Sequence, residues 1–181
     1  MIAYTGATTF LTNTDEVENA PTSWADIKDG DYTVALGDIN GGNAQAAVIA
    51  SAYAFGGDLN NLDPAFDFWT QLAEDGRINT LDILQQNFET GEIPVGVIWS
   101  FTAIPYKNQI TKYKLQANIP TDGSIMSGYA SVINKYAPHA CAAALAREYI
   151  FSDEGQANLA AAGAIPTRTD VEIPEEIQNA T

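Results

Sequence analysis

Cysteine, histidine and basic side chains are scarce in this sequence, and each scarcity excludes a class of protein. Cys141 is the single cysteine, which excludes an internal disulfide, and His139 is the single histidine. One residue of each type is too few for a zinc site built from these ligands. Eight lysines and arginines against 23 acidic residues leave a formal charge of −15. This charge opposes binding to nucleic acid, because the phosphates would be repelled.

Long apolar segments are also missing. No run approaches the roughly 18 consecutive apolar residues of a membrane-spanning helix. Met1 is not followed by the basic and apolar residues of an export leader, so we expect any leader to lie outside this sequence. A hydrophobic fraction of 46% over 181 residues still suffices for one medium-sized domain, or for one domain plus part of another.

Groups that could carry catalysis are few and scattered. His139 and Cys141 lie two residues apart at the start of an alanine-rich segment, where they could form a nucleophile pair. No surrounding signature orients such a pair, so we favour a surface histidine and a small buried cysteine. Acidic residues are plentiful but spread along the chain, and no acid–base pair stands out. The sequence therefore favours binding over catalysis.

The order of the elements predicts an α/β fold, because strand-like segments alternate with helical ones. Spacing of apolar residues, proline and glycine predicts strands over Ile2–Thr12, Val34–Leu36, Pro94–Trp99 and Tyr113–Ile119, an extended segment over Ile125–Ile133, and helices over 43–55, 64–75, 80–90, 102–110 and 138–151. Trp69 and Phe88 lie on the apolar stripes of their helices and are expected to be largely buried.

The stretch Val34–Gly57 joins a short strand, a glycine-rich loop and a helix. Asn40 or Asn43 is expected to cap the helix, and Gly56-Gly57 to end it. Stripes through Val48 and Ile49 predict that most of this helix is buried. Its N-terminus would offer backbone N–H groups to an anion. An ordinary strand-to-helix turn rich in glycine and asparagine explains the same pattern, and both readings stay open.

Aromatic residues follow one of the predicted strands. Trp99 ends the strand Pro94–Trp99, and Phe101 lies one step beyond. The carboxyl ends of strands are where open α/β sheets present their ligands. Packing in the core is the alternative explanation for a tryptophan at this position.

Several segments in order resemble a known family. They read AYTGATTFLTNTDEVENAPTSWADI, DYTVALGD, ETGEIPVGVIWS, GYASVINKYAPHACAAALAREYIFSDEGQANLA and AIPTR. The sequence resembles type 2 extracellular solute-binding proteins of ABC importers, in the group that binds polyamines, ferric ion and aminophosphonates. The resemblance covers nearly the whole chain, and TSWADI and AREYIFSDEGQ together are its most specific parts.

The resemblance implies a type 2 periplasmic-binding-protein-like lobe with a central mixed sheet flanked by helices. Such proteins have two lobes joined by crossing strands, with the ligand in the cleft between them. Ala3–Thr12 would be the first crossing and Gly123–Ile133 the second, so the chain would start at the first crossing. The implied domains are a second lobe with its hinge strand over 1–122, a returning strand and helices of the first lobe over 123–165, and a surface tail over 166–181.

The resemblance also implies ligand-binding residues, which fall in three places. The helix-start loop would hold an anionic group, the strand end would supply aromatic contacts, and the two crossing strands would line the cleft. The residues implied are Asn40, Gly41, Gly42 and Asn43 in the loop, Trp99 and Phe101 at the strand end, Tyr4 and Thr5 at the first crossing, and Met126 and Tyr129 at the second.

Departures from the family pattern reduce the number of ligand classes that the sequence allows. Ferric-ion binders have two consecutive tyrosines where this chain has Phe101-Thr102, which disfavours iron. Polyamine binders tend to have an acidic residue where Ser127-Gly128-Tyr129 stand, which disfavours a polycation. A small polar solute with an anionic group remains, and an amine could contact the aromatic faces.

The expected function is therefore that of the substrate-binding component of an ABC importer, without catalysis, metal or cofactor. The solute and the importer's membrane subunits are its expected partners, and its place is the periplasm or the cell exterior, including a cell-surface lipoprotein. A ligand-sensing effector domain of a regulator is the alternative in the same fold, and a phosphate-handling enzyme is the less favoured one.

The returning segment Ile125–Ile133 gives a further expectation. It would lack the strands that it pairs with in the family, and an unpaired edge is a template for association. We expect it either to fold back on the second lobe or to form a homodimer, and solute affinity to be weak because one wall of the cleft is missing.

Overall fold

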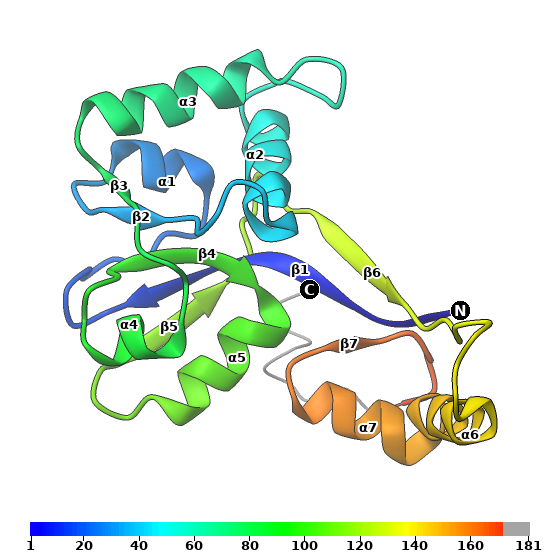
Figure 1. Ribbon diagram of the computed structural model, residues 1–181. Helices are drawn as coiled ribbons and strands as arrows, with labels where there is room; N and C mark the ends of the chain where they lie inside the picture. The colour runs from blue at the N-terminus through cyan, green and yellow to red at the C-terminus, as the bar shows by residue number, and fades with distance from the viewer. Residues whose placement is uncertain (172–181) are drawn as a thin grey trace. The chain divides into compact units, whose positions relative to one another are not determined.

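The computed structural model describes residues 1–171 (Figure 1). The end of the tail, with Glu172, Glu175 and Glu176, lies outside the described residues. The chain divides into two compact units: unit 1 comprises Met1–Gly6 and Met126–Thr181, and unit 2 comprises Ala7–Ile125. Strand β1 (Ile2–Asn13) contributes residues to both units.

Unit 2 is built on a mixed sheet with the strand order β3-β2-β4-β1-β5. Its other strands are β2 (Val34–Ala35), β3 (Ile78–Asn79), β4 (Val95–Trp99) and β5 (Leu115–Asn118). Strand β2 is parallel to both β3 and β4, whereas β1 is antiparallel to β4 and β5. The predicted strands 34–36, 94–99 and 113–119 are confirmed, with shorter ends.

Side chains of this sheet are buried on both faces, which explains the continuous apolar run of β4. Phe10, Val34 and Val97 pack with α1 (Trp24–Asp29), α2 (Gly42–Ala54) and α3 (Asp63–Glu74) in one cluster. Leu11, Ala35 and Ile98 pack with α4 (Gln85–Glu89) and α5 (Ser100–Gln109) in a second cluster. Figure 1 shows these two groups of helices on opposite sides of the sheet. Neighbouring residues of each strand therefore enter different halves of the core.

Helix α2 lies against the sheet through its small residues. Ala47 and Ala50 are fully buried, whereas Val48 and Ile49 are only partly buried and Tyr53 is exposed. The predicted burial is therefore confirmed at Ala52, which is fully buried, and wrong at Tyr53. Alanines allow a close approach of the helix to the sheet, which leaves the larger side chains at the margin of the contact. The predicted glycine end is confirmed at Gly56, whose φ of 83° suits glycine.

The predicted helix over 80–90 is wrong for its first half, because α4 spans only Gln85–Glu89. Side-chain hydrogen bonds hold the preceding residues as a loop. The Asn79 side chain accepts from the Leu81 N–H at 3.0 Å, and the Asn87 side chain donates to the Asp82 carbonyl at 2.7 Å. Such bonds compete with those of a helix. Phe88 is buried as expected, but Leu84 is exposed.

Trp69 packs against the first core cluster and keeps a smaller part of its surface exposed, so the expectation that it is largely buried is confirmed. Its indole N–H donates to the Ser51 hydroxyl at 3.0 Å, and its ring contacts Trp24 edge-to-face. A tryptophan with a polar partner near the surface commonly keeps one edge exposed.

Unit 1 is held together by β1 and one buried polar side chain. Its other elements are β6 (Met126–Ala130), α6 (Ala140–Ile150), α7 (Asp153–Ala161) and β7 (Ile165–Pro166). Both β6 and β7 pair with β1, so the segment expected to lack a strand partner has one. The fully buried Gln156 donates to the carbonyls of Ala3 and Ile150 and accepts from the Thr167 N–H. This amide links β1, α6 and the end of β7.

Helix α6 has no buried residue. Cys141 is exposed, which contradicts the expectation of a small buried cysteine, because the partly buried side of this helix is formed instead by Ala143, Ala144, Arg147 and Ile150. His139 directly precedes the helix and is exposed, as expected of a surface histidine.

The buried ring of Trp24 gives a test of the core of unit 2. Its indole N–H donates to the Gly123 carbonyl at 2.7 Å, and Phe10 contacts it edge-to-face. Trp24→Phe should lower the free energy of unfolding by about 1–3 kcal/mol, because the partly buried Gly123 carbonyl loses its donor. Phe66→Ala, at a side chain that is 53% exposed, is the control and should change it by less than about 1 kcal/mol. Urea unfolding measures both, and equal effects would contradict this account.

Candidate ligand-binding site

Three parallel strands of unit 2 end at the same edge of the sheet. Strands β3, β2 and β4 run in one direction, so the segments that follow them lie together there. A cavity of about 300 Å³ opens at this edge. Its lining comes from the loop after β2, the start of α2, the loop after β3 and the junction of β4 with α5, namely Leu36, Gly37, Asp38, Gly41, Asn43, Asp82, Ile83, Leu84, Ile98, Trp99 and Thr102.

The Asn43 side chain, which the sequence analysis considered as a helix cap, instead holds the start of α2 in place through two hydrogen bonds. Gly41 is the N-cap residue and no side chain caps the helix, so the expected caps Asn40 and Asn43 are wrong. The Asn43 side chain instead donates to the carbonyls of Leu36 at 3.2 Å and Val97 at 2.6 Å. It thereby ties the first turn of α2 to the residue after β2 and to the middle of β4. The backbone N–H groups of this turn have no acceptor within the helix.

Helix α5 also begins at the cavity. Trp99 is its N-cap residue, without a capping hydrogen bond from its side chain, and the Ser100 hydroxyl accepts from the Ala7 N–H at 3.2 Å. Neither α2 nor α5 has an acidic residue in its first turn. Two helix N-termini with their partial positive charge therefore lie at one cavity.

Trp99 is half-buried, so it is neither a core residue nor a fully exposed one. Its ring stacks with that of Phe101, with centroids 6.1 Å apart and planes within 12°. Of the predicted residues of unit 2, Gly41, Asn43 and Trp99 line the cavity. Asn40, Gly42 and Phe101 are neighbours of these residues in the chain but are not part of the lining.

The other four predicted residues belong to unit 1. The rings of Tyr4 and Tyr129 stack with centroids 4.9 Å apart and planes within 8°. Burial raises the pKa of Tyr129, and Tyr4 raises it further. The Thr5 hydroxyl donates to the Ile165 carbonyl at 3.5 Å, and Met126 is 59% exposed. Their role as ligand contacts stays a prediction.

Sequence reasoning missed the two acidic residues of the cavity. Asp38 follows Gly37 in the loop between β2 and α2. This position near a strand end could have indicated Asp38 as a residue of the cavity. Asp82, Ile83 and Leu84 were hidden by the helical spacing of Leu81, Leu84 and Phe88. The structure places them in a loop whose side chains line the cavity.

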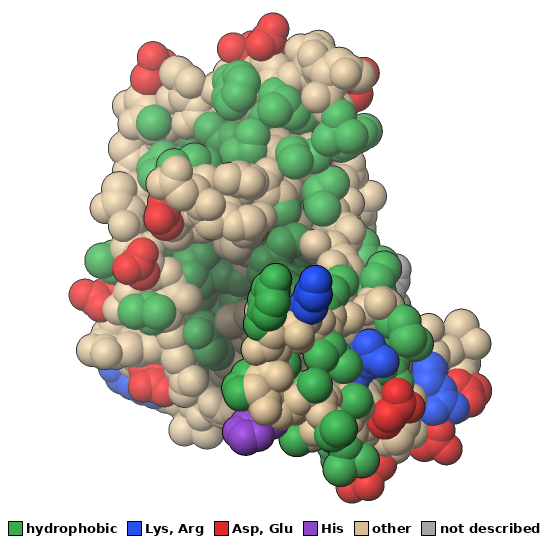
Figure 2. Space-filling model, turned by 45° about the vertical axis from the view of Figure 1, so that its right-hand side comes forward, with side chains coloured by type: hydrophobic (Ala, Val, Ile, Leu, Met, Phe, Trp, Pro, Cys, Tyr) green, Lys and Arg blue, Asp and Glu red, His purple; other side chains and the backbone are tan. Residues whose placement is uncertain are grey.

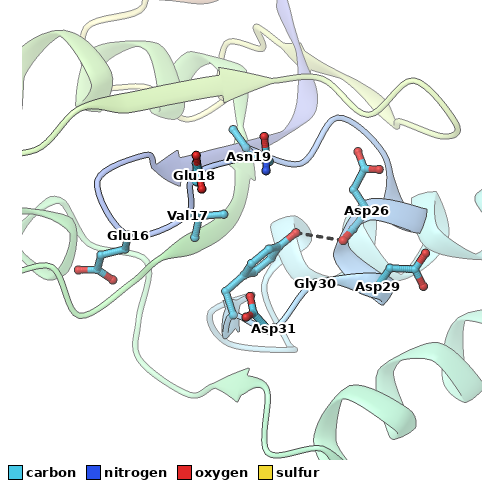
Figure 3. A pocket seen from close by; sticks show the side chains of 10 residues that line it. Glu16, Val17, Glu18, Asn19, Asp26, Asp29, Gly30 and Asp31 are labelled. Carbon is cyan, nitrogen blue, oxygen red and sulfur yellow. Dashed lines mark hydrogen bonds between the residues drawn. The ribbon is translucent and has the colours of Figure 1, made fainter.

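A larger cavity of about 590 Å³ lies at the opposite edge of the sheet (Figure 3). It is formed by the loop after β1, by α1 and by the turn before β2, where the parallel strands begin. Five carboxylates line it, those of Glu16, Glu18, Asp26, Asp29 and Asp31. Figure 3 shows these side chains around the opening. None of the predicted ligand-binding residues lies here, so the smaller cavity is the better candidate.

The described residues give no sign of a metal centre or a membrane span. Within residues 1–171, no three histidine, cysteine or acidic side chains are grouped closely enough to hold a metal ion. In the same part of the chain, every helix is too short or too polar to cross a bilayer.

The larger cavity gives a prediction about alkaline pH. Burial raises the pKa of Tyr32 to about 12, although Arg77 partly opposes the shift. The folded state keeps the Tyr32 proton that the unfolded state loses above its ordinary pKa of about 10. The free energy of unfolding should therefore fall between pH 10 and 12 more steeply for the natural chain than for Tyr32→Phe. Urea unfolding across this range measures both slopes, and equal slopes would refute the prediction.

Asn43 gives a second prediction. Asn43→Ala should lower the free energy of unfolding by about 1–3 kcal/mol, because the carbonyls of Leu36 and Val97 lose their donor. Gln45→Ala, at an exposed position two residues on, is the matched control in the same helix and should have a smaller effect. Chemical denaturation of both variants measures the difference. A loss at position 45 as large as that at position 43 would show that Asn43 does not hold α2 in place.

Comparison with solved structures shows the fold. The sulfate-binding protein SubI from Mycobacterium tuberculosis H37Rv is 18% identical with a TM-score of 0.78, covering 98% of this chain and 60% of that one. The periplasmic binding protein AfuA from Actinobacillus pleuropneumoniae, with fructose-6-phosphate bound, is 22% identical with a TM-score of 0.70, covering 97% and 57%. Maltose-bound MalE3 from T. maritima is 17% identical with a TM-score of 0.74, covering 100% and 57%.

These likenesses confirm the fold class that the sequence predicted, a type 2 periplasmic-binding-protein lobe with a mixed sheet between helices. The chain spans no more than 60% of the length of the three structures. In a comparison with curated protein sequences, none matches significantly.

A family model described as bacterial extracellular solute-binding protein matches residues 1–180. This match confirms the resemblance to solute-binding proteins that the sequence indicated. It also confirms the expected periplasmic or extracellular location. Because the match covers nearly the whole sequence, the chain belongs to the family of bacterial extracellular solute-binding proteins.

Proposed function

We propose that this chain carries a solute-binding wall of the substrate-binding component of an ABC importer. The observation that carries the proposal is the 300 Å³ cavity at the carboxyl ends of β3, β2 and β4. Family membership supports it, because members of this family bind solutes outside the cell. The volume lies at the lower limit of known ligand pockets, which suits a small solute.

The cavity suits a solute with an anionic group. The N-termini of α2 and α5 supply partial positive charge without an acidic side chain in either first turn. Gly41 and Gly42 add no side-chain bulk at the start of α2, so an anion can approach the backbone N–H groups closely. Leu36, Ile83 and Ile98 supply apolar contacts for the rest of the solute.

The proposed partners are the solute and the membrane subunits of the importer, with binding and no catalysis. The regulator domain and the phosphate-handling enzyme have no specific observation in their favour, and we do not propose them. The homodimer stays a prediction. It rests on unit 1 side chains such as Val132, Tyr136 and Leu145, which are 82%, 83% and 73% exposed. Hydrophobic side chains are visible on the face drawn in Figure 2.

A variant of Trp99 tests whether this cavity binds the solute. A thermal-shift screen of amino acids, phosphonates and polyamines identifies a binding compound, and calorimetry then measures its affinity. Trp99→Ala should weaken binding by about 1–3 kcal/mol, because an aromatic contact at the cavity is lost. The control is Phe66→Ala, an exposed aromatic side chain of α3 that does not line the cavity. Unchanged affinity in Trp99→Ala, with the fold intact by circular dichroism, would place the binding site elsewhere.

A further inference from the structure

We propose that Asn40 is a site of spontaneous deamidation, and that the product disturbs the start of α2 beside the candidate cavity. Asn40-Gly41 is the single asparagine–glycine pair in the sequence. The modification needs no other protein, because the backbone nitrogen of Gly41 is itself the nucleophile. Its effect on solute binding rests on the proposed function, whereas the modification does not.

The reaction is a ring closure followed by hydrolysis. The Gly41 nitrogen gives up its proton to base in the solvent and attacks the side-chain carbonyl carbon of Asn40. A carbon–nitrogen bond forms, the bond from that carbon to Nδ2 breaks, and the amide nitrogen takes a proton from water and leaves as ammonia. Water then opens either carbonyl of the succinimide ring, which gives aspartate or isoaspartate at position 40.

The glycine at position 41 and the exposure of Asn40 favour this ring closure. Glycine has no Cβ, so its nitrogen can approach the preceding side chain with little steric hindrance. Asn40 is exposed, so water and base reach its side chain. The Gly41 N–H donates to the Asp38 carbonyl at 2.8 Å, and this bond must open before the nitrogen reacts. Deamidation should therefore be slower in the folded chain than in the chain unfolded by urea.

A second turn of unit 2 has the same hydrogen bonds but no glycine. In the turns Asp38–Gly41 and Asp58–Asn61, the aspartate side chain accepts from the N–H two residues on, at 2.9 and 2.7 Å. The aspartate carbonyl accepts from the N–H three residues on, at 2.8 and 3.1 Å. Asn40 and Asn60 are both exposed. The second turn therefore serves as an internal control for the residue that follows the asparagine.

Deamidation removes a hydrogen bond from the turn that precedes α2. The Asn40 side-chain amide donates to the Asp38 carboxylate at 2.9 Å. A carboxylate at position 40 cannot donate this bond, and two carboxylates so close together repel each other. Because the next residue, Gly41, is the N-cap residue of α2, the repulsion acts directly on the start of the helix. The added negative charge also opposes an anion at this N-terminus.

Peptide mapping by mass spectrometry after incubation at mildly alkaline pH tests the modification, which adds one mass unit. We expect Asn40 to deamidate about tenfold faster than Asn60, or more, because only Asn40 precedes a glycine. Gly41→Asn should remove this difference, and Asn61→Gly should raise the rate at Asn60 toward that at Asn40. Circular dichroism shows whether each variant remains folded.

Asn40→Asp tests the effect of the product on the start of α2. The amide signals of Gly41 and Gly42 are followed by ¹H–¹⁵N NMR during titration with inorganic sulfate, which serves as an anion probe. Asn40→Asp should raise the dissociation constant of sulfate by about threefold or more. The matched control Asn60→Asp adds the same charge in the second turn and should leave this constant unchanged.

The possible failures are distinguishable. Equal rates at Asn40 and Asn60 would overturn the modification, as would an unchanged rate at Asn60 in Asn61→Gly. If Asn40→Asp binds sulfate as tightly as the natural chain does, the proposed effect on the start of α2 is overturned. If sulfate moves neither signal in the natural chain, the anion site of the proposed function is contradicted, while the deamidation rates still decide the modification.

Discussion

Parallel pairing of β2 with both β3 and β4 is the constraint on which the candidate site depends. Because the three strands run in one direction, a glycine-rich loop, a helix start and an irregular loop meet at a single edge of the sheet. The pairing itself is short, with two residues of β2 matched to each neighbour. Its stability therefore relies on helices packed over both faces, and this burial requires apolar residues at successive positions of β4.

The sequence predicted the helices and strands that have strong periodicity or clear ends, and it failed where side-chain hydrogen bonds decide the local structure. Pro64 near the start and Gly76 just after the end indicated α3 correctly. The segment before α4 was misread because Leu81, Leu84 and Phe88 have helical spacing, while Asn79 and Asn87 hold the backbone in a loop. Helical spacing alone cannot reveal such competing bonds.

The candidate site was only partly predictable for a related reason. Trp99 and Gly41 could be placed from the strand-loop-helix order, since Trp99 ends a strand and Gly41 lies in the loop between a strand and a helix. Asp82 comes from the misread segment, and its place in the same cavity as Asp38 depends on the pairing of β3 with β2, which joins residues 44 positions apart (Val34 with Ile78). Long-range pairing of two-residue strands leaves almost no local signal in a sequence. The acidic part of the cavity was therefore visible only in three dimensions.

Gly96 allows the ring of Phe88 to lie directly on β4, because a Cβ atom at this position would come within 2.6 Å of the ring. This contact anchors α4 through a buried residue, while the loop before α4 is held by bonds to its backbone. Exchange of the exposed side chains at positions 82 and 84 would thus alter the cavity without disturbing either anchor. Ligand preference can accordingly diverge among descendants of this protein through a few loop substitutions, with little cost to folding.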